Sequence, residues 1–354
     1  MRKILLVSWY HPEVIFGGVE TIFRYLEKEL NAEWVNLDDV IKSLAIIPIS
    51  RDYYRFAVVD RSYYVCKYLK QYEELFGLDL IIADDCTVPW YIPKAKLITI
   101  AQNPYEFIAD KLYPEFYTIH NYIEFGKLYV ELQKLQYDFS DVIVCPSEYM
   151  RKYAQKLTGY QHPEIRLIPH GIDTDLFKPI DLAREEFGVP ADRPIGLWVG
   201  GFHPVKGWHI MQRIIKKFKD VYWICVFKHV ISGKPILKNV RVLSKVQYDK
   251  MPELYNLADF YISTSLVESF GLCPFEAMAC NTPIITPQVG YFDGVKEGVY
   301  DYGIVRNDLE SAVADMLKLL KTSYEFNPRK FVWENLRKEL WVKEWKHLID
   351  EILS

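Results

Sequence analysis

The sequence lacks the features that mark several common protein classes. None of its six cysteines forms a Cys-x-x-Cys pair or another zinc-ligand spacing, which argues against a structural metal site. Its 43 Lys and Arg residues do not exceed its 47 Asp and Glu residues, so a dedicated nucleic-acid binder is not expected. No stretch approaches the roughly 20 apolar residues of a membrane-spanning helix. The apolar run at the N-terminus ends at Ser8, too early for a secretory signal.

Length and composition indicate a globular protein of two domains. Hydrophobic residues make up 50% and charged residues 25% of the 354 residues, which excludes wholesale disorder. Cysteines within apolar runs, such as Cys145 and Cys225, are expected to be buried and reduced. We therefore expect a cytoplasmic protein, monomeric or homodimeric, with peripheral contact at the inner membrane face as an alternative location.

Aromatic residues are abundant, at 15% of the chain. There are 26 tyrosines, and thirteen of them lie between Tyr53 and Tyr137. Aromatic faces pack well against sugar rings, and the hydroxyl groups form hydrogen bonds at wet surfaces. This concentration makes the first half a candidate for ligand recognition, although many of these rings are expected in the core.

Short apolar runs alternate with helical patterns in the first half. This alternation predicts a parallel sheet with helices on both faces. The runs predicted as strands are Lys3–Trp9, Ala45–Ile49, Leu78–Ala83, Leu97–Ala101 and Val142–Cys145. The helical patterns are one that follows the Gly17-Gly18 turn and ends at about Leu30, and those at Glu124–Gln136 and Glu148–Leu157.

A similar series begins near Pro194, and each half opens with an apolar strand, a Gly-Gly pair and a helix. Two doubly wound domains would place the carboxyl ends of their strands, where ligands bind, across one cleft. The linker is expected at Pro179–Pro194, and the tail Arg329–Leu353 is amphipathic. The predicted strands are Ile195–Val199, Val221–Phe227, Val240–Leu243, Phe260–Ser263 and Pro283–Thr286, and the predicted helices are Trp208–Phe218 and Leu309–Lys321.

The most informative segment is Ser263–Gly290, in which seven residues separate Glu268 from Glu276. Pro274 is acceptable in a first helical turn, and Glu276 suits the positive end of the helix dipole. One interpretation is therefore structural: a first-turn acid and a loop carboxylate. The other is chemical, because free N–H groups before a helix hold anions or sugar oxygens, and two carboxylates accept hydrogen bonds from hydroxyl groups.

This segment resembles the E-x7-E region of glycosyltransferase family 4, a family of retaining enzymes of the GT-B fold. The run from Glu268 to Pro283 follows the family pattern nearly residue by residue. Four other segments resemble family motifs in the right order, and the likeness is loosest between Asn31 and Ser140. They are Gly17-Gly18-Val19-Glu20, Ile168–Pro179, Val199–Gly207 and Phe331-Val332-Trp333-Glu334.

The resemblance implies a GT-B architecture: two Rossmann-like, doubly wound α/β domains that face each other across a cleft. The first, residues 1–180, would bind the acceptor, and the second, residues 181–328, the nucleotide sugar. Residues 329–354 would form a helix that crosses back to the first domain.

The resemblance also implies site roles by position. Lys206 would neutralise the diphosphate, Glu268 would hold sugar hydroxyls, and Glu276 would bind the ribose; we take Lys206 and Glu268 as the catalytic pair. The glycines would let the backbone approach the phosphates, because no side chain intervenes. The remaining donor-binding residues would be Gly17, Gly18, Gly200, Gly201, Phe270, Gly271 and Leu272.

The chain departs from the family pattern in three places. Gly201 stands where the family usually has the arginine that joins the lysine on the diphosphate, so His203, Lys228 or Lys234 would have to substitute. Gln102 stands at the place of a usual histidine; it can bind a sugar but cannot take a proton, and His120 is a second candidate for a sugar or acceptor contact. Asn281 replaces a common glycine in a turn that tolerates the left-handed conformation.

We therefore expect a retaining, metal-independent glycosyltransferase with no cofactor, whose donor is a nucleoside diphosphate sugar and whose acceptor is a glycan, a lipid-linked molecule or a small molecule. The alternatives are a catalytically weak binder of nucleotide sugar or glycan, and a sugar-nucleotide epimerase. No Asp-x-Asp motif stands in an obvious loop, and Asp84-Asp85 follows a strand, where it could cap or pair locally.

The stretch Arg51–Lys70 combines cations with tyrosines. It could form a basic aromatic surface for a lipid-linked or anionic acceptor. The alternative is an ordinary amphipathic helix with solvated cations.

Overall fold

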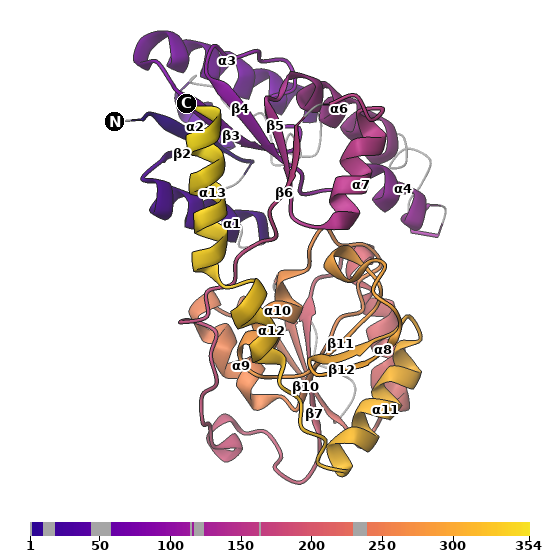
Figure 1. Cartoon of the computed structure of the whole chain (residues 1–354). Coiled ribbons are helices and arrows are strands. Elements are labelled where there is room, and N and C mark those ends of the chain that lie inside the picture. Colours follow the sequence, from indigo (N-terminus) through magenta and orange to yellow (C-terminus); the bar gives the residue numbers. More distant parts are fainter. Residues whose placement is uncertain are drawn as a thin grey trace. The chain divides into compact units, whose positions relative to one another are not determined.

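The computed structural model describes residues 2–9, 18–43, 58–113, 115–116, 124–162, 164–228 and 239–354. Its internal contacts divide the chain into two units. Unit 1 is Met1–His170 together with Trp341–Ser354, and unit 2 is Gly171–Leu340. Each unit contains a sheet with helices packed against it (Figure 1).

In its described residues, unit 1 has six parallel strands in the order β2-β1-β3-β4-β5-β6. β3 and β5 are buried at every residue, as expected for parallel strands that helices cover on both faces. The strands are β1 (Ile4–Val7), β2 (Glu33–Val35), β3 (Leu80–Asp84), β4 (Lys96–Ile100), β5 (Val142–Cys145) and β6 (Ile165–Leu167).

Helices of unit 1 bury apolar stripes against this sheet. Val65 and Leu69 of α3 pack in one cluster with Leu5 and Ile81. The end of the chain joins unit 1 through a ring contact between Tyr25 and Trp341, whose centroids lie 6.3 Å apart. The helices are α1 (Gly18–Leu30), α2 (Leu37–Ser43), α3 (Val58–Phe76), α4 (Tyr105–Leu112), α6 (Tyr129–Phe139), α7 (Glu148–Leu157) and most of α13 (Lys338–Ile352), with a π-helical turn at Glu124–Leu128.

The described part of unit 2 contains seven strands in the order β12-β13-β11-β10-β7-β8-β9. All neighbours are parallel except β12, which pairs with β13 in the antiparallel sense. The order reverses between β7 and β10, which is the switch point of a doubly wound sheet. The strands are β7 (Ile195–Gly200), β8 (Tyr222–Phe227), β9 (Val240–Ser244), β10 (Phe260–Ile262), β11 (Ile284–Thr286), β12 (Gly298–Tyr300) and β13 (Gly303–Val305).

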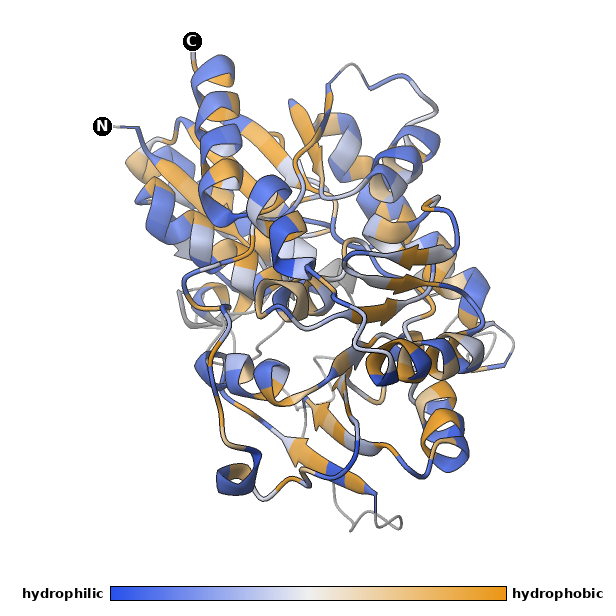
Figure 2. Cartoon of the chain, turned by 60° about the horizontal axis from the view of Figure 1, so that its bottom comes forward, coloured by the Kyte–Doolittle hydropathy of each residue, from blue (hydrophilic) through white to orange (hydrophobic). Residues whose placement is uncertain are grey.

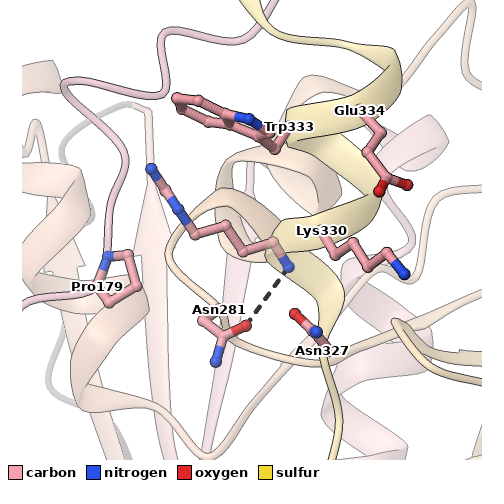
Figure 3. Close-up of a pocket in the computed structure, with 7 residues that line it drawn as sticks. Pro179, Asn281, Asn327, Lys330, Trp333 and Glu334 are labelled. Atoms are coloured by element: carbon pink, nitrogen blue, oxygen red, sulfur yellow. Dashed lines mark hydrogen bonds between the residues drawn. The ribbon is translucent and has the colours of Figure 1, made fainter.

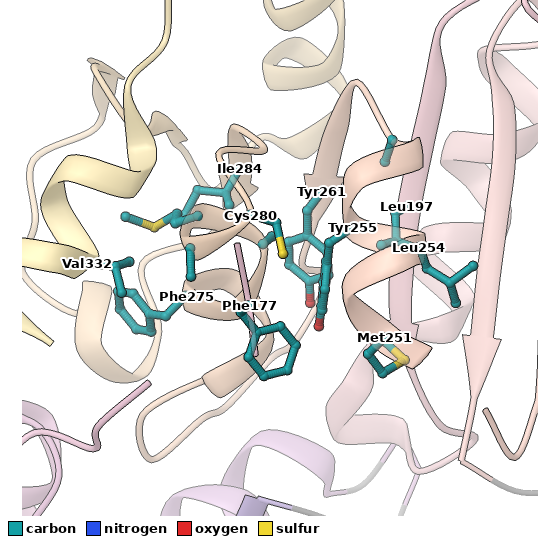
Figure 4. Packing of buried hydrophobic residues seen from close by; sticks show 14 of the residues in the cluster. Phe177, Leu197, Met251, Leu254, Tyr255, Tyr261, Phe275, Cys280, Ile284 and Val332 are labelled. Carbon is teal, nitrogen blue, oxygen red and sulfur yellow. The ribbon is translucent and has the colours of Figure 1, made fainter. Parts of the chain in front are cut away.

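Successive residues of β7 face opposite cores of unit 2, as the period of a strand requires. Trp198 packs with α8 and α11, whereas Leu197 packs with α9, α10 and α12 (Figure 4). The apolar colouring of the strands, between helices with polar outer faces, shows the same layering (Figure 2). The helices are α8 (Trp208–Lys217), α9 (Met251–Leu257), α10 (Leu272–Ala279), α11 (Leu309–Lys321) and α12 (Pro328–Asn335).

The prediction of two α/β, doubly wound sheets is confirmed, and several elements match their predicted bounds. The strand Val142–Cys145 and the helices Glu148–Leu157 and Leu309–Lys321 have the expected limits. The predicted strand Ala45–Ile49 lies outside the described residues. The three-residue strands β2, β6, β12 and β13 were not predicted, because they are too short to carry a periodic signal.

The division between the units falls after His170, earlier than the limit of 180 expected from the sequence. The reason is packing: Phe177 is fully buried in the core of unit 2, and Val189 packs in the same core. Arg329 donates hydrogen bonds to the carbonyl groups of Thr174 (3.1 Å) and Phe177 (2.9 Å). Residues 171–180 therefore belong with unit 2.

The expected tail, residues 329–354, forms two helices instead of one. α12 ends before Leu336, whose carbonyl accepts a 2.7 Å hydrogen bond from the amide of Ile172, and Lys338 donates back to the Ile172 carbonyl at 2.9 Å. Lys338 also pairs with Asp173 at 2.9 Å. α12 therefore stays with unit 2, and the chain joins unit 1 only from Trp341 onward. Within the described ranges, no helix is both long and apolar enough to cross a membrane.

Candidate functional site

The conspicuous polar groups of unit 2 lie in two loops that follow β7 and β10. These strands are neighbours at the point where the strand order reverses. Residues 201–207 lead from β7 into α8, and residues 263–271 lead from β10 into α10. Ligands of doubly wound sheets bind in the crevice at such a point, outside the carboxyl ends of the strands.

Hydrogen bonds lock the two loops together. The indole of Trp198 donates to Thr264 Oγ1 at 2.8 Å, and this hydroxyl donates to the Lys206 carbonyl at 2.8 Å. The amide of Leu266 donates to the Val205 carbonyl at 2.7 Å. Gly207 adopts a positive φ of 65°, and a Cβ atom there would lie 1.9 Å from the Thr264 carbonyl oxygen. Only glycine permits this close approach.

Lys206 and Glu268 meet across the two loops. The ammonium of Lys206 lies 2.6 Å from Glu268 Oε1, and Ser265 Oγ donates to the same oxygen at 2.7 Å. Burial alone would lower the pKa of Lys206, but the Glu268 carboxylate outweighs it and raises that pKa. The lysine side chain is 39% exposed and the glutamate 18%, so both groups are oriented by their contact and still open to a ligand. Within the described residues, Glu268 Oε2 has no hydrogen-bond partner.

The amide groups that were predicted to bind the donor stand next to this pair. Leu272 is the first residue of α10, and Gly271 precedes it with a φ of 91° and no side-chain cap. The first N–H groups of a helix have no partner inside the helix, so they attract negative charge. The ring of Phe270 is buried, 4.9 Å from that of Phe275. Gly290 packs closely against this loop, because a Cβ atom at that position would lie only 2.7 Å from the Phe270 carbonyl oxygen.

Glu276 lies deeper, on α10, and is only 4% exposed. Tyr248 donates to its Oε1 at 2.9 Å, and Tyr255 donates to its Oε2 at 2.7 Å. Burial raises the pKa of Glu276, whereas the two tyrosine hydrogen bonds oppose the rise. Glu276 is thus a buried carboxylate that accepts two hydrogen bonds, rather than an exposed acid in a first helical turn.

The departures from the family pattern have distinct surroundings. A Cβ atom at Gly201 would meet nothing within 4 Å, so packing does not require glycine there. The Val205 amide donates a 3.4 Å hydrogen bond to the His203 ring. Burial lowers the pKa of His203, and the positive charge of Lys206 lowers it further, so the ring is neutral near pH 7. Lys228 is exposed after β8. Asn281 has a φ of 66°, as predicted for a left-handed position.

Gln102 lies just beyond β4 in unit 1 and is 6% exposed. Its Oε1 is 3.2 Å from Nε2 of His170, a residue of the Ile168–Pro179 motif. Burial lowers the pKa of His170 to about 3, so the ring is neutral. Nε2 of Gln102 is buried and has no hydrogen-bond partner among the residues that the structure describes. The sequence had not indicated His170 as a neighbour of Gln102.

Asp84 is the last residue of β3 in unit 1 and Asp85 follows it, and both are buried. Asp85 Oδ2 accepts hydrogen bonds from the amides of Gln102 (2.6 Å) and Asn103 (2.7 Å), and Tyr137 donates to Oδ1 at 2.9 Å. Burial raises the pKa of Asp85 to about 6, and burial together with Asp85 raises that of Asp84 further above its usual range. The described residues contain no group of three His, Cys, Asp or Glu arranged to hold a metal ion.

Gly18, the first residue of α1, is exposed. Gly17, His120 and Lys234 lie outside the described residues. The described part of Arg51–Lys70 forms most of α3, an amphipathic helix with Val65 buried and Lys67 exposed. The helix interpretation is therefore confirmed there, and the acceptor surface stays a prediction.

A separate pocket of about 380 Å³ lies beside α12 in unit 2 (Figure 3). It contains none of the predicted site residues. Arg329, one of its lining residues, lies 5.7 Å from the ring centroid of Trp333 and donates to backbone carbonyls. The lining is therefore structural for the most part: Pro179, Asn281, Asn327, Arg329, Lys330, Trp333 and Glu334.

Sequence reasoning missed the residues that hold the site together. Tyr248 and Tyr255 reach Glu276 from 28 and 21 residues away in the chain. Ser265, Gly207 and Gly290 shape the loops around Glu268. Ser265, Gly207 and Gly290 lie within the motif segments, and this position was their sequence signal, whereas the two tyrosines carried none.

Solved structures of low sequence identity share the fold. Sucrose-phosphate synthase from Thermosynechococcus elongatus matches with a TM-score of 0.80 and 17% identity, covering 99% of each chain. HepE from Anabaena, in complex with UDP and glucose, matches with a TM-score of 0.71 and 17% identity, covering 99% of this chain and 100% of that one. The predicted GT-B architecture is thereby confirmed.

Curated relatives match part of the chain. A D-inositol 3-phosphate glycosyltransferase of Acidothermus cellulolyticus is 31% identical over 157 residues, which are 38% of this chain and 35% of that protein. The GPI3 subunit of a phosphatidylinositol N-acetylglucosaminyltransferase of Saccharomyces cerevisiae is 28% identical over 163 residues, 42% of this chain and 36% of that protein. The chain thus spans little more than a third of the length of these relatives.

Two family descriptions cover nearly all of the chain. "Glycosyltransferase Family 4" matches residues 16–176, and "Glycosyl transferases group 1" matches residues 179–338. The boundary between the matches falls in the segment that connects the two sheets. The matched ranges include Lys206, Glu268 and Glu276. The chain belongs to glycosyltransferase family 4.

Proposed function

We propose that this chain is a retaining, metal-independent glycosyltransferase that moves a sugar from a nucleoside diphosphate sugar to an acceptor hydroxyl. The observation that carries the proposal is the Lys206–Glu268 pair, held at 2.6 Å beside the start of α10, where the strand order of unit 2 reverses. A cation, N–H dipoles and a carboxylate with a free oxygen are the groups that bind a diphosphate and an adjacent sugar.

Each group has a separate role in this proposal. Lys206 and the first amides of α10 stabilise the charge that develops on the departing diphosphate. Glu268 accepts hydrogen bonds from sugar hydroxyls through Oε2 while Ser265 holds its other oxygen. Glu276 accepts hydrogen bonds from the ribose. Because HepE was solved with UDP and glucose, UDP-glucose is the first donor to test.

The reaction is proposed to proceed on one face of the sugar. The bond between the anomeric carbon and the phosphate oxygen breaks, and the acceptor oxygen bonds to that carbon from the same side. The acceptor proton passes to the departing phosphate oxygen. No protein base is needed for this step, which fits Gln102 at the place of the usual histidine, because an amide cannot accept a proton at neutral pH.

For the acceptor, we propose a polyol that carries a phosphate, free or attached to a lipid. The names of the relatives refer to inositol 3-phosphate and to phosphatidylinositol. Lys67 and Lys70 on the exposed face of α3 would suit such an anionic molecule or a cytoplasmic membrane surface. Retention on anionic vesicles, measured at low and high salt, tests the membrane part.

The experiment that tests the function is release of nucleoside diphosphate. The protein is incubated with UDP-, GDP- and ADP-sugars and with inositol phosphate or phosphatidylinositol, with and without EDTA. We expect release with at least one donor, unchanged by EDTA, and NMR of the product to show the anomeric configuration of the donor. Inversion of that configuration, or loss of activity with EDTA that added metal restores, would contradict the retaining or the metal-independent part.

Gly201 and Gln102 favour a second candidate, a protein that holds a nucleotide sugar without transferring it, because both departures remove groups that usually contact the donor. Measurable UDP or GDP binding without release from any donor would support this candidate. An epimerase is distinguished by its product, a free epimerised sugar or nucleotide sugar instead of a new glycoside.

A further inference from the structure

Glu276 is a carboxylate with unusual support. It is 4% exposed, yet in the described part of the chain no Lys, Arg or His pairs with it. Lys206, the cation of the candidate site, pairs with Glu268 instead. A buried carboxylate without a cation is costly unless hydrogen bonds satisfy its oxygens. Here both hydrogen bonds come from tyrosines, Tyr248 to Oε1 and Tyr255 to Oε2.

The other ionisable groups around Glu276 do not stabilise its negative charge. The thiols of Cys273 and Cys280 and the hydroxyl of Tyr261 feel its charge, but burial raises the pKa of each, so they are neutral. Burial likewise raises the pKa of Glu276 itself, and only the two tyrosine hydrogen bonds lower it. The tyrosines are therefore the groups that favour the ionised form.

The two rings are held by aromatic packing. The ring of Phe177 lies 5.2 Å from that of Tyr248 and 6.0 Å from that of Tyr255, in T-shaped contacts with both. Tyr255 also lies 6.0 Å from Tyr261 (Figure 4). Phe177 is fully buried, and Arg329 donates to its carbonyl. The hydroxyl groups thus approach Glu276 from fixed directions.

We infer that Tyr248 and Tyr255 are positioning residues that hold Glu276 ionised and oriented, so that its unused lone pairs recognise the vicinal hydroxyls of a ribose. This inference rests on the proposed function, in which Glu276 binds the nucleoside. A carboxylate offers about four lone-pair sites. The tyrosines occupy one site on each oxygen, and one site on each oxygen is left for a cis-diol.

Nucleotide binding to the full chain tests the inference. Isothermal titration calorimetry with UDP, GDP and ADP identifies the nucleotide that binds most tightly, and its 2′-deoxy form and inorganic pyrophosphate serve as probes without the diol and without the nucleoside. Titrations run from pH 5.5 to 8 with wild type, Tyr248→Phe and Tyr255→Phe. Tyr291→Phe is the matched control, because Tyr291 packs on Phe275 in the same core but makes no hydrogen bond to Glu276.

We expect the wild type to bind the ribonucleotide about tenfold more tightly than its 2′-deoxy form, the size of one hydrogen bond to a charged group. This preference should weaken as the pH falls, because protonated Glu276 loses acceptor sites. In either tyrosine variant the pKa of Glu276 should rise further, so we expect the preference to disappear at a higher pH than in wild type. Pyrophosphate affinity should be unchanged, and Tyr291→Phe should follow the wild type.

The same preference and pH profile in wild type and both variants would overturn the inference while leaving the proposed function intact. It would also be overturned if the tyrosine variants lost as much affinity for pyrophosphate as for the nucleotide, since that would indicate general damage to the site. If no nucleotide binds the wild type, the proposed function fails and this inference fails with it. Should Tyr255→Phe not fold, Tyr248→Phe carries the test, because the Tyr248 ring is exposed in part.

Discussion

The two sheets present polar groups at the carboxyl ends of their strands in different states. In unit 2, Lys206 and Ser265 both donate hydrogen bonds to Glu268, and two tyrosines donate to Glu276. In the described part of unit 1, Oδ1 of Asp84 and Nε2 of Gln102 are buried with no hydrogen-bond partner. A buried polar atom without a partner costs roughly 1–3 kcal/mol. Among the described residues, the polar groups of unit 2 are therefore held by partners within the unit, whereas unit 1 buries two polar atoms without such partners.

The tyrosines of unit 1 have more than one role. The thirteen tyrosines between residues 53 and 137 were expected to favour acceptor recognition. Several of their hydroxyls instead pair with acids inside unit 1: Tyr72 with Glu33, Tyr91 with Glu73, and Tyr137 with Asp85. Those three serve the fold, and Tyr63, which is 55% exposed on α3, is still available for a ligand.

Removing the cation of unit 2 is expected to have the largest effect. Lys206→Ala takes away the charge that balances the departing diphosphate and leaves Glu268 without its partner. We expect nucleoside diphosphate release to fall about 10²–10³-fold, the usual effect of losing one such contact. Lys217→Ala is the control, since Lys217 forms an exposed ion pair with Glu310 in the same unit. Activity within a few-fold of wild type would remove Lys206 from the mechanism.

The close approach of the two loops predicts the next largest effect. In Gly207→Ala, the Cβ atom would meet the Thr264 carbonyl at 1.9 Å, and the φ of 65° is itself strained for alanine. We expect the free energy of unfolding to fall by about 2–3 kcal/mol, measured by chemical denaturation. Gly201→Ala is the matched variant, with open space around it and little change expected. Similar losses in both variants would show that the loops are not locked as described.

The sequence predicted elements whose signals are local. α7 has its expected limits because Ser147 caps it, accepting a hydrogen bond from the Met150 amide at 3.2 Å. Within the candidate site, the contiguous run Glu268–Glu276 identified the donor-binding loop. What the sequence missed depends on distant contacts: the break in the tail comes from Ile172 against Leu336, and the support of Glu276 comes from α9 and the turn before it. No local pattern records such partners.

Adding a charge tests whether the cationic site of unit 2 is incomplete. Gly201 stands where the family usually has arginine, its surroundings are open, and His203 is neutral near pH 7. We expect Gly201→Arg to increase affinity for a nucleoside diphosphate about tenfold through a charge-assisted hydrogen bond, measured by calorimetry. Gly201→Gln controls for the added side chain without the charge. Unchanged affinity in both variants would indicate that another group already supplies the second cation.

The acid pair of unit 1 predicts the smallest effect, a dependence of stability on pH. Burial raises the pKa of Asp85 to about 6 and that of Asp84 above its usual range, the latter also through Asp85 and Glu20. A raised carboxyl pKa favours the folded state at low pH, and this contribution is lost as the pH rises through the folded-state pKa. Between pH 5 and 8 the wild type should therefore lose about 1–3 kcal/mol of unfolding free energy from this pair.

Asp84→Asn removes one of the two charges while keeping the shape of the side chain. We expect a flatter stability profile and greater stability than wild type at pH 8, measured by chemical denaturation at each pH. Asp138→Asn, at an exposed position of α6, should leave the profile unchanged. If the free energy of unfolding of Asp84→Asn changed with pH in the same way as that of wild type, the acid pair would not destabilise the folded state. The contrast between a satisfied unit 2 and an unsatisfied unit 1 would then rest on Gln102 alone.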